Sequence, residues 1–185
     1  CFIRSDDDCV ALKGLDFTGP NSNVERITVE KCTLWCDRAR IFLLGHESRA
    51  AYMRDVVLRN LDIIHFTMTA FLLEPGEDMR LENVTAEDIR IHGEGQREFI
   101  RLRPTVNQYM RKKVPGFIED VRFKNVTVDG KPGEYLVQIQ GADAEHDVQD
   151  VTFKNVSILG EKLTRESNRV KLGENTKDIR FVPQP

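Results

Sequence analysis

The sequence predicts an all-β fold in which residues 1–185 form one domain, a right-handed, single-stranded parallel β-helix of about six coils. Three observations support this prediction: a repeat of about thirty residues, alternation of apolar and polar residues within it, and an asparagine that recurs at one position. Repeats of this length indicate a solenoid, because one coil cannot bury its own apolar face and must share a core with its neighbours.

The first column of the repeat shows the alternation typical of β-strands. Its copies read ITVEKCTLW from Ile27, VVLRNLDII from Val56, MRLENVTAE from Met79, VRFKNVTVD from Val121 and VTFKNVSIL from Val151, with a shorter IRFVP from Ile179. The fifth position holds Lys31, Asn60, Asn83, Asn125 and Asn155. Asparagine tolerates a left-handed bend and can hydrogen-bond its copy in the next coil. We therefore expect a ladder here, in preference to glycosylation at the Asn-Val-Thr and Asn-Val-Ser sequences.

A second column also alternates with the period of a strand. Its copies read CVALK, IFLLG, AFLLE, FIRLR, LVQIQ and RVKLG, and their anchor residues are Leu12, Leu44, Leu73, Leu102, Ile139 and Leu172. We expect these anchors to form one internal stack. No amphipathic segment of helical length lies between the two columns, which disfavours helical repeats.

Side chains that alternate with the anchors should face solvent, with copies about 4.8 Å apart in adjacent coils. Leu43 and Leu72 have this parity, and so do the polar residues Lys13, Glu74, Arg101, Arg103, Gln138 and Gln140. Planar, hydrogen-bonding groups of this kind suit sugar hydroxyls or carboxylates. We expect one exposed binding face, continuous with Asp7; the alternative is an ordinary solvated sheet.

Composition restricts the partners. With 27 basic and 30 acidic residues, the net charge of −3 argues against nucleic acid or an anionic membrane as a partner. No apolar run approaches the length of a membrane-spanning helix, and no signal peptide is present. The chain starts in the middle of a pattern and without Met, so we expect it to be part of a longer β-helix whose first coils precede Cys1. Oligomeric state stays open.

Three consecutive aspartates, Asp6, Asp7 and Asp8, precede the first anchor strand. Like charges at this spacing repel one another, so the cluster is costly unless it forms a solvated turn or supplies carboxyl groups with separated pKa values. A carboxylic acid beside a carboxylate is the pair that general acid and base catalysis requires.

The stretch DDDCVALK, followed by strand repeats, resembles the polygalacturonase-like proteins of glycoside hydrolase family 28, and also the dextranase-type β-helix hydrolases. Asp7 and Asp8 match the catalytic Asp pair of those families, Cys9 matches the cysteine after it, and Asp6 occupies a position that is usually neutral. The resemblance implies a pectin lyase-like fold, a secreted or periplasmic glycosidase of carbohydrate metabolism, no cofactor or metal, and a third Asp one coil upstream. It also implies a disulfide between Cys9 and Cys36; the alternative is that Cys32 and Cys36 are small buried residues.

The next coils depart from the polygalacturonase pattern. CDRARIFLLG replaces its Gly-His-Gly segment and places Arg38 and Arg40 there, followed by His46 and Glu47, while Glu74 stands where an Arg-x-Lys pair is expected. We expect these five residues and Asp6 to bind substrate, and we expect the family scaffold without polygalacturonase activity.

One insertion, RPTVNQYMRKKVPGF, interrupts the repeat after Leu102. Its Tyr109, beside several cations, suits a sugar-stacking subsite, although a solvated loop is an equal alternative.

Three functions are compatible with the sequence: a glycoside hydrolase that cleaves O-glycosidic bonds, which we favour, a non-catalytic glycan-binding module, and a polysaccharide lyase. The glycan, its linkage and the choice between endo and exo cleavage stay open.

Overall fold

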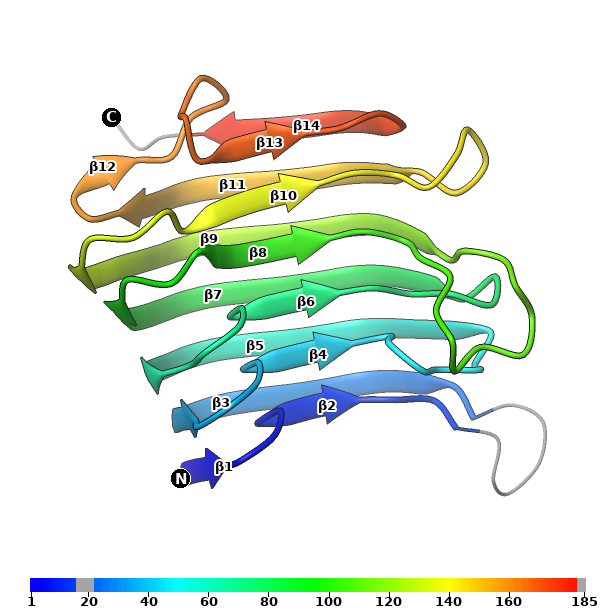
Figure 1. Cartoon of the computed structure of the whole chain (residues 1–185), viewed down its shortest axis with the longest axis horizontal. Coiled ribbons are helices and arrows are strands. Elements are labelled where there is room, and N and C mark those ends of the chain that lie inside the picture. The colour runs from blue at the N-terminus through cyan, green and yellow to red at the C-terminus, as the bar shows by residue number, and fades with distance from the viewer. Residues whose placement is uncertain (16–21, 183–185) are drawn as a thin grey trace.

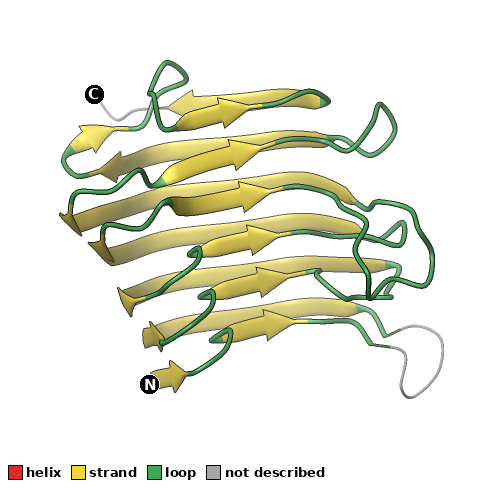
Figure 2. Cartoon of the chain, viewed as in Figure 1, coloured by secondary structure: helices red, strands yellow, loops and turns green. Residues whose placement is uncertain are grey.

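The computed structural model describes residues 1–15 and 22–182, and within these residues the chain consists of strands and loops without a helix (Figure 2). Each coil contributes one short strand and one long strand (Figure 1). The short strands are β2 (Val10–Leu12), β4 (Phe42–Leu44), β6 (Phe71–Leu73), β8 (Glu98–Leu102), β10 (Leu136–Ile139) and β13 (Val170–Leu172). The remaining strands are β1 (Phe2–Ser5), β3 (Val24–Cys36), β5 (Tyr52–His65), β7 (Arg80–Glu94), β9 (Phe117–Lys131), β11 (Val148–Ile158), β12 (Glu161–Lys162) and β14 (Thr176–Val182).

The strands form two parallel sheets that wind as a right-handed β-helix, which confirms the predicted fold class. The six-stranded sheet has the order β13-β10-β8-β6-β4-β2. The eight-stranded sheet has the order β1-β3-β5-β7-β9-β11-β12, with β14 also paired to β11. The short strand β12 pairs antiparallel with β11. The core fills the space between the sheets, where residues equivalent in successive coils stack.

The predicted stack of anchor residues is confirmed by the strand register. Leu12 pairs with Leu44, Leu44 with Leu73, Leu73 with Leu102, Leu102 with Ile139 and Ile139 with Leu172. The four inner anchors are buried, whereas the two at the ends are partly exposed because a neighbouring coil covers them on one side. Phenylalanines stack in the same way, and the Phe153 ring lies 5.2 Å from that of Phe123 and 4.9 Å from that of Phe181.

The long strands bend at two positions in each full coil, where the backbone is left-handed. One set is Arg26, Asp55, Asn83, Asp120, Asp150 and Asp178, and the other is Lys31, Asn60, Asp88, Asn125 and Asn155. The predicted ladder is present: the Asn155 amide donates to Asn125 Oδ1 at 2.9 Å, and the Asn125 amide donates to Asp88 at 2.8 Å.

The third copy of the first column starts at Val84 in the structure, five residues after the predicted Met79. Val56 pairs with Val84, not with Met79, so Asn83 belongs to the first set of bends and donates to Asp55 at 2.7 Å. The reason is that both bends of a coil take the same residue types and lie five residues apart. A shift by that amount therefore places one bend on the other and preserves the pattern.

The outward side chains at the centre of the short strands form what we call the outer row: Ala11, Leu43, Leu72, Arg101, Gln138 and Lys171. Contrary to the expectation that this parity faces solvent, Leu43 and Leu72 are each only 2% exposed, although neither belongs to the main core. Ala11, at one end of the row, is exposed, and beyond the two covered leucines Arg101 and Gln138 are half-buried and Lys171 is exposed.

Candidate functional site

The three aspartates form a turn between β1 and β2, which we call the aspartate turn (residues 6–8). Asp8 is nearly buried, and its Oδ1 accepts the Arg40 backbone N–H at 3.0 Å and lies 3.5 Å from the Arg40 guanidinium. Asp6 pairs with Arg38 at 3.1 Å, with both side chains exposed. Asp7 is exposed, its Oδ1 accepts the Asp8 N–H at 2.9 Å, and it forms no ion pair with any residue the structure describes. The turn is therefore held by two arginines of the next coil, and Asp7 is the carboxylate left open to solvent.

Cys9 and Cys36 lie against each other beneath the aspartate turn. The Cys9 thiol donates to the Trp35 carbonyl at 3.0 Å, and the Cys36 thiol donates to the Asp7 carbonyl at 3.2 Å. Burial, with a smaller contribution from neighbouring Cys36, raises the pKa of Cys9 to about 11. All four cysteines are free thiols in the structure, so the predicted Cys9–Cys36 disulfide stays a prediction.

A second group of predicted binding residues gathers at the opposite, C-terminal ends of the short strands, centred on Glu74. Contrary to the prediction, Glu74 is buried, at 5% exposed, because it lies between His46, whose Nδ1 is 3.3 Å away, and Arg103, whose Nη2 is 3.0 Å away. Burial acts to raise the pKa of Glu74, but its hydrogen bond to His46 and the charges of Arg103 and His46 outweigh burial and lower that pKa. Beside this group, Lys13 pairs with Glu47 at 2.6 Å.

The inserted loop of residues 103–116 packs against this group and is not a loosely solvated loop. Thr105 N–H donates to the Pro75 carbonyl at 3.0 Å, Glu77 N–H donates to the Val114 carbonyl at 2.8 Å, and Met110 is buried. Tyr109 is 50% exposed, with its ring edge-on to that of His46 at 6.2 Å. Tyr109 therefore offers an anchored, exposed aromatic surface.

The predicted residues of the outer face lie either at the centres of the short strands or at their C-terminal ends. Arg101 pairs with Glu98, which precedes it on β8. Arg101, Arg103, Gln138 and Gln140 line a small cavity of about 40 Å³. The predicted set therefore forms no continuous exposed site: the covered Leu43 and Leu72 separate its two edges in the first coils.

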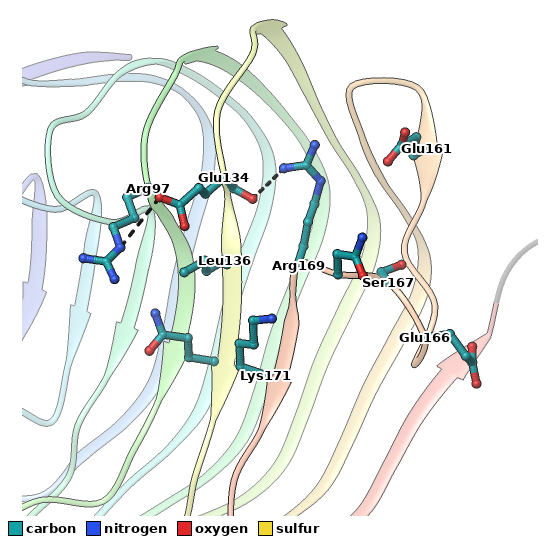
Figure 3. Close-up of a pocket in the computed structure, with 10 residues that line it drawn as sticks. Arg97, Glu134, Leu136, Glu161, Glu166, Ser167, Arg169 and Lys171 are labelled. Carbon is teal, nitrogen blue, oxygen red and sulfur yellow. Dashed lines mark hydrogen bonds and ion pairs between the residues drawn. The ribbon is translucent and has the colours of Figure 1, made fainter.

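A cavity of about 840 Å³ lies on the outside of the six-stranded sheet in the last three coils (Figure 3). Its lining residues are Arg97, Glu134, Leu136, Gln138, Glu161, Glu166, Ser167, Asn168, Arg169 and Lys171. Gln138 is the one member that the sequence identified as a candidate. The outward parity of Lys171 was a usable signal, whereas most of the other residues come from turns and loops, whose positions the repeat does not predict.

The wall of this cavity is ordered by Arg169. Its Nη1 donates to the carbonyl of Glu134 at 2.5 Å (Figure 3). It also donates to the carbonyl of Gly133 at 2.6 Å, so that Arg169 ties the turn before β10 to the start of β13. Arg97 lies 3.8 Å from the Glu134 carboxylate. Lys171 forms no ion pair with the part of the chain that the structure describes, so its ammonium is available to a ligand.

The aspartate turn and the cavity lie along one edge of one sheet. Asp8 and Arg40 stand two residues before the paired Val10 and Phe42, and Arg169 stands one residue before Val170, which occupies the same register position in the last coil. From β2, the strands β8, β10 and β13 are three to five steps away. At about 4.8 Å per step, the cavity extends from about 14 to 24 Å beyond the aspartates.

Comparison of the chain with models of protein families, with curated proteins and with solved structures finds no match. Among the residues described, no helix has the length and hydrophobicity needed to span a membrane. The same residues contain no group of three or more His, Cys, Asp or Glu side chains able to hold a metal ion.

Proposed function

We propose that the chain acts on a polysaccharide, which it binds on the outside of the six-stranded sheet and hydrolyses at the aspartate turn. The observation that supports this proposal best is the cavity of about 840 Å³ on the same sheet edge as Asp7 and Asp8. Its size is that of a ligand site, for which about 300–1,000 Å³ is usual. Its distance from the aspartates suits an extended, repeating ligand better than a small molecule.

The lining of the cavity favours a neutral glycan. Arg97, Arg169 and Lys171 supply three cations and Glu134, Glu161 and Glu166 supply three carboxylates, so the formal charges cancel. Amide and hydroxyl groups from Gln138, Asn168 and Ser167 both donate and accept hydrogen bonds, as sugar hydroxyls do, and Leu136 adds an apolar surface for a sugar ring. A strongly acidic glycan would meet as many carboxylates as cations.

The aspartate turn supplies the two carboxyl groups that hydrolysis requires. We assign Asp7, exposed and without a cation partner, to protonate the glycosidic oxygen as the bond to the anomeric carbon breaks. Asp8, held by Arg40, is assigned to accept a proton from the water whose oxygen bonds to that carbon. One proton is donated and one is accepted, so the reaction adds one water across the bond.

The test is a panel of neutral and acidic polysaccharides, with new reducing ends and binding measured separately. Asp7→Asn and Asp8→Asn should each lower the hydrolysis rate by about 10²-fold or more while binding is retained. Asp129→Asn, on the eight-stranded sheet, is the matched control and should have no effect.

The cavity is tested in parallel. Lys171→Ala should weaken binding to neutral glycans, and Lys154→Ala, which removes an exposed lysine from the eight-stranded sheet, should leave it unchanged. Equal binding by both variants, together with no hydrolysis of any polysaccharide, would refute the proposal.

A second candidate is a glycan-binding module without catalysis. It is favoured by the ion pairs of Asp6 with Arg38 and of Asp8 with Arg40, which give the aspartates a purely structural use in joining the first two coils. Glycan binding without hydrolysis by the wild-type protein would select this candidate.

A further inference from the structure

Four cysteines gather where the first coil meets the second, and they form two pairs. Cys1 Sγ lies 2.9 Å from Cys32 Sγ at the start of β1. At the other end of the same segment, the Cys9 thiol neighbours Cys36, whose charge and hydrogen bond help to raise the pKa of Cys9. The resemblance described above involves Cys9 and Cys36, whereas nothing in it concerns Cys1 and Cys32.

The backbone places Cys1 and Cys32 directly opposite each other. The amino group of Cys1 donates to the Lys31 carbonyl at 2.9 Å, and the Thr33 N–H donates to the Cys1 carbonyl at 2.8 Å. The parallel ladder continues from there with Phe2 opposite Thr33. Adjacent strands lie about 4.8 Å apart, which falls within the Cα separation of about 4.4–6.8 Å that a disulfide spans. A bridge at this position therefore requires side-chain rotation and no movement of the backbone.

We propose that Cys1 and Cys32 are a modification site, at which oxidation forms a disulfide between the first two coils. The oxidant is a low-molecular-weight disulfide such as oxidised glutathione. One cysteine thiolate attacks this disulfide, releases one reagent thiol and forms a mixed disulfide; the second cysteine then displaces the other reagent thiol. The two protein sulfurs lose two electrons and two protons in total, and the reagent takes up both.

The bridge has a consequence for the aspartate turn, which rests on the proposed function. β1 lies at the edge of its sheet and pairs with β3. The side chains that tie residues 1–8 to the second coil are mostly exposed, as in the Arg4–Asp37 pair, where Arg4 is 60% exposed. Such pairs contribute little in water. Oxidation at Cys1 and Cys32 therefore fixes the start of a segment whose end carries the proposed catalytic carboxylates.

The test uses a Cys9→Ser/Cys36→Ser double variant, which leaves Cys1 and Cys32 as the remaining cysteines. After treatment with oxidised glutathione, trypsin should release the peptide ending at Arg4 covalently joined to the peptide Cys32–Arg38, and a reductant should separate them. The control adds Cys32→Ser, after which Cys1 should carry only glutathione. Two separately glutathionylated or unmodified thiols in the double variant would overturn the proposal.

Wild-type protein provides a second measurement if the double variant does not fold. Chymotrypsin cleaves after Trp35 and so separates Cys32 from Cys36, and the linked peptides should pair Cys1 with Cys32. Amide exchange across residues 2–5 should be slower by at least about tenfold in the oxidised protein, because opening of β1 is restrained. Linkage of Cys1 to any other cysteine, or unchanged exchange, contradicts the proposal. None of these measurements depends on glycan hydrolysis. A failure of the disulfide proposal can therefore be distinguished from a failure of the proposed function.

Discussion

Replacing Glu74 by glutamine tests the electrostatic centre at the C-terminal ends of the short strands. The change preserves volume and opens no cavity, but it removes the negative charge of the Glu74 carboxylate. That carboxylate lies 3.3 Å from His46 Nδ1 and 3.0 Å from Arg103 Nη2. Hydrogen bonds to a buried charged group contribute about 1.5–3 kcal/mol each. The Arg103 side chain is 46% exposed, so its contribution is reduced by solvent screening. We expect Glu74→Gln to lower the free energy of unfolding by about 2 kcal/mol at about pH 7.

The same substitution predicts a pH dependence. The pKa of Glu74 in the folded protein lies below the ordinary value of 4.5, so the stabilisation is fully present above that value and is lost as pH falls through the lowered pKa. Urea unfolding at about pH 7 and about pH 3 should show a difference between wild type and Glu74→Gln that shrinks in acid. Glu145→Gln, at an exposed loop position, is the control and should stay within about 0.5 kcal/mol of wild type. A Glu74→Gln protein as stable as wild type at neutral pH, or a difference that persists in acid, would refute the reasoning.

We also predict the effects of two further substitutions and the rate of one chemical modification. Asn125→Ala should cost about 1–2 kcal/mol in urea unfolding, because alanine loses both ladder hydrogen bonds and strains the left-handed backbone at φ 52°; unchanged stability would argue against the ladder. Phe153→Ala should cost about 3–5 kcal/mol by the same measurement, since its ring stacks between two others in the core, and a cost below about 1 kcal/mol would contradict that packing. In the reduced protein, iodoacetamide should modify Cys9 slowly at neutral pH and faster as pH rises toward the raised pKa of about 11, as peptide mass spectrometry can measure; rapid modification at neutral pH would show that the thiol is not protected by burial.

The sequence predicted the parts of the fold that repeat. Anchor residues such as Leu44 and Leu73 occupy the same position in every coil, and alternation fixes which of their neighbours point inward. The error at Met79 arose because the two bends of a coil look alike, so a local pattern could not distinguish them without the pairing of Val56 with Val84. The type of residue that recurs in each coil can therefore be predicted from the sequence. Which residue of one coil pairs with which residue of the next depends on long-range contacts.

Site residues were less predictable because local partners decide their surroundings. Parity placed Glu74 on the outer face correctly, but it could not reveal that His46 and Arg103 would enclose it. The cavity was missed because it depends on the Arg169 guanidinium donating to the Glu134 carbonyl, a contact between turns of different coils. Those turns vary in length and carry no repeat, so no periodic signal marks them.

The two sets of left-handed bends make each coil an interchangeable module. Since every internal coil presents the same bends to the coil above and the coil below, a whole coil can be duplicated or removed without altering the cross-section of the solenoid. Each such event between β2 and β8 changes the distance between the aspartates and the cavity by one step of about 4.8 Å. Evolution or engineering can therefore lengthen or shorten the reach of this surface in fixed increments, while the residues at its two ends stay unchanged.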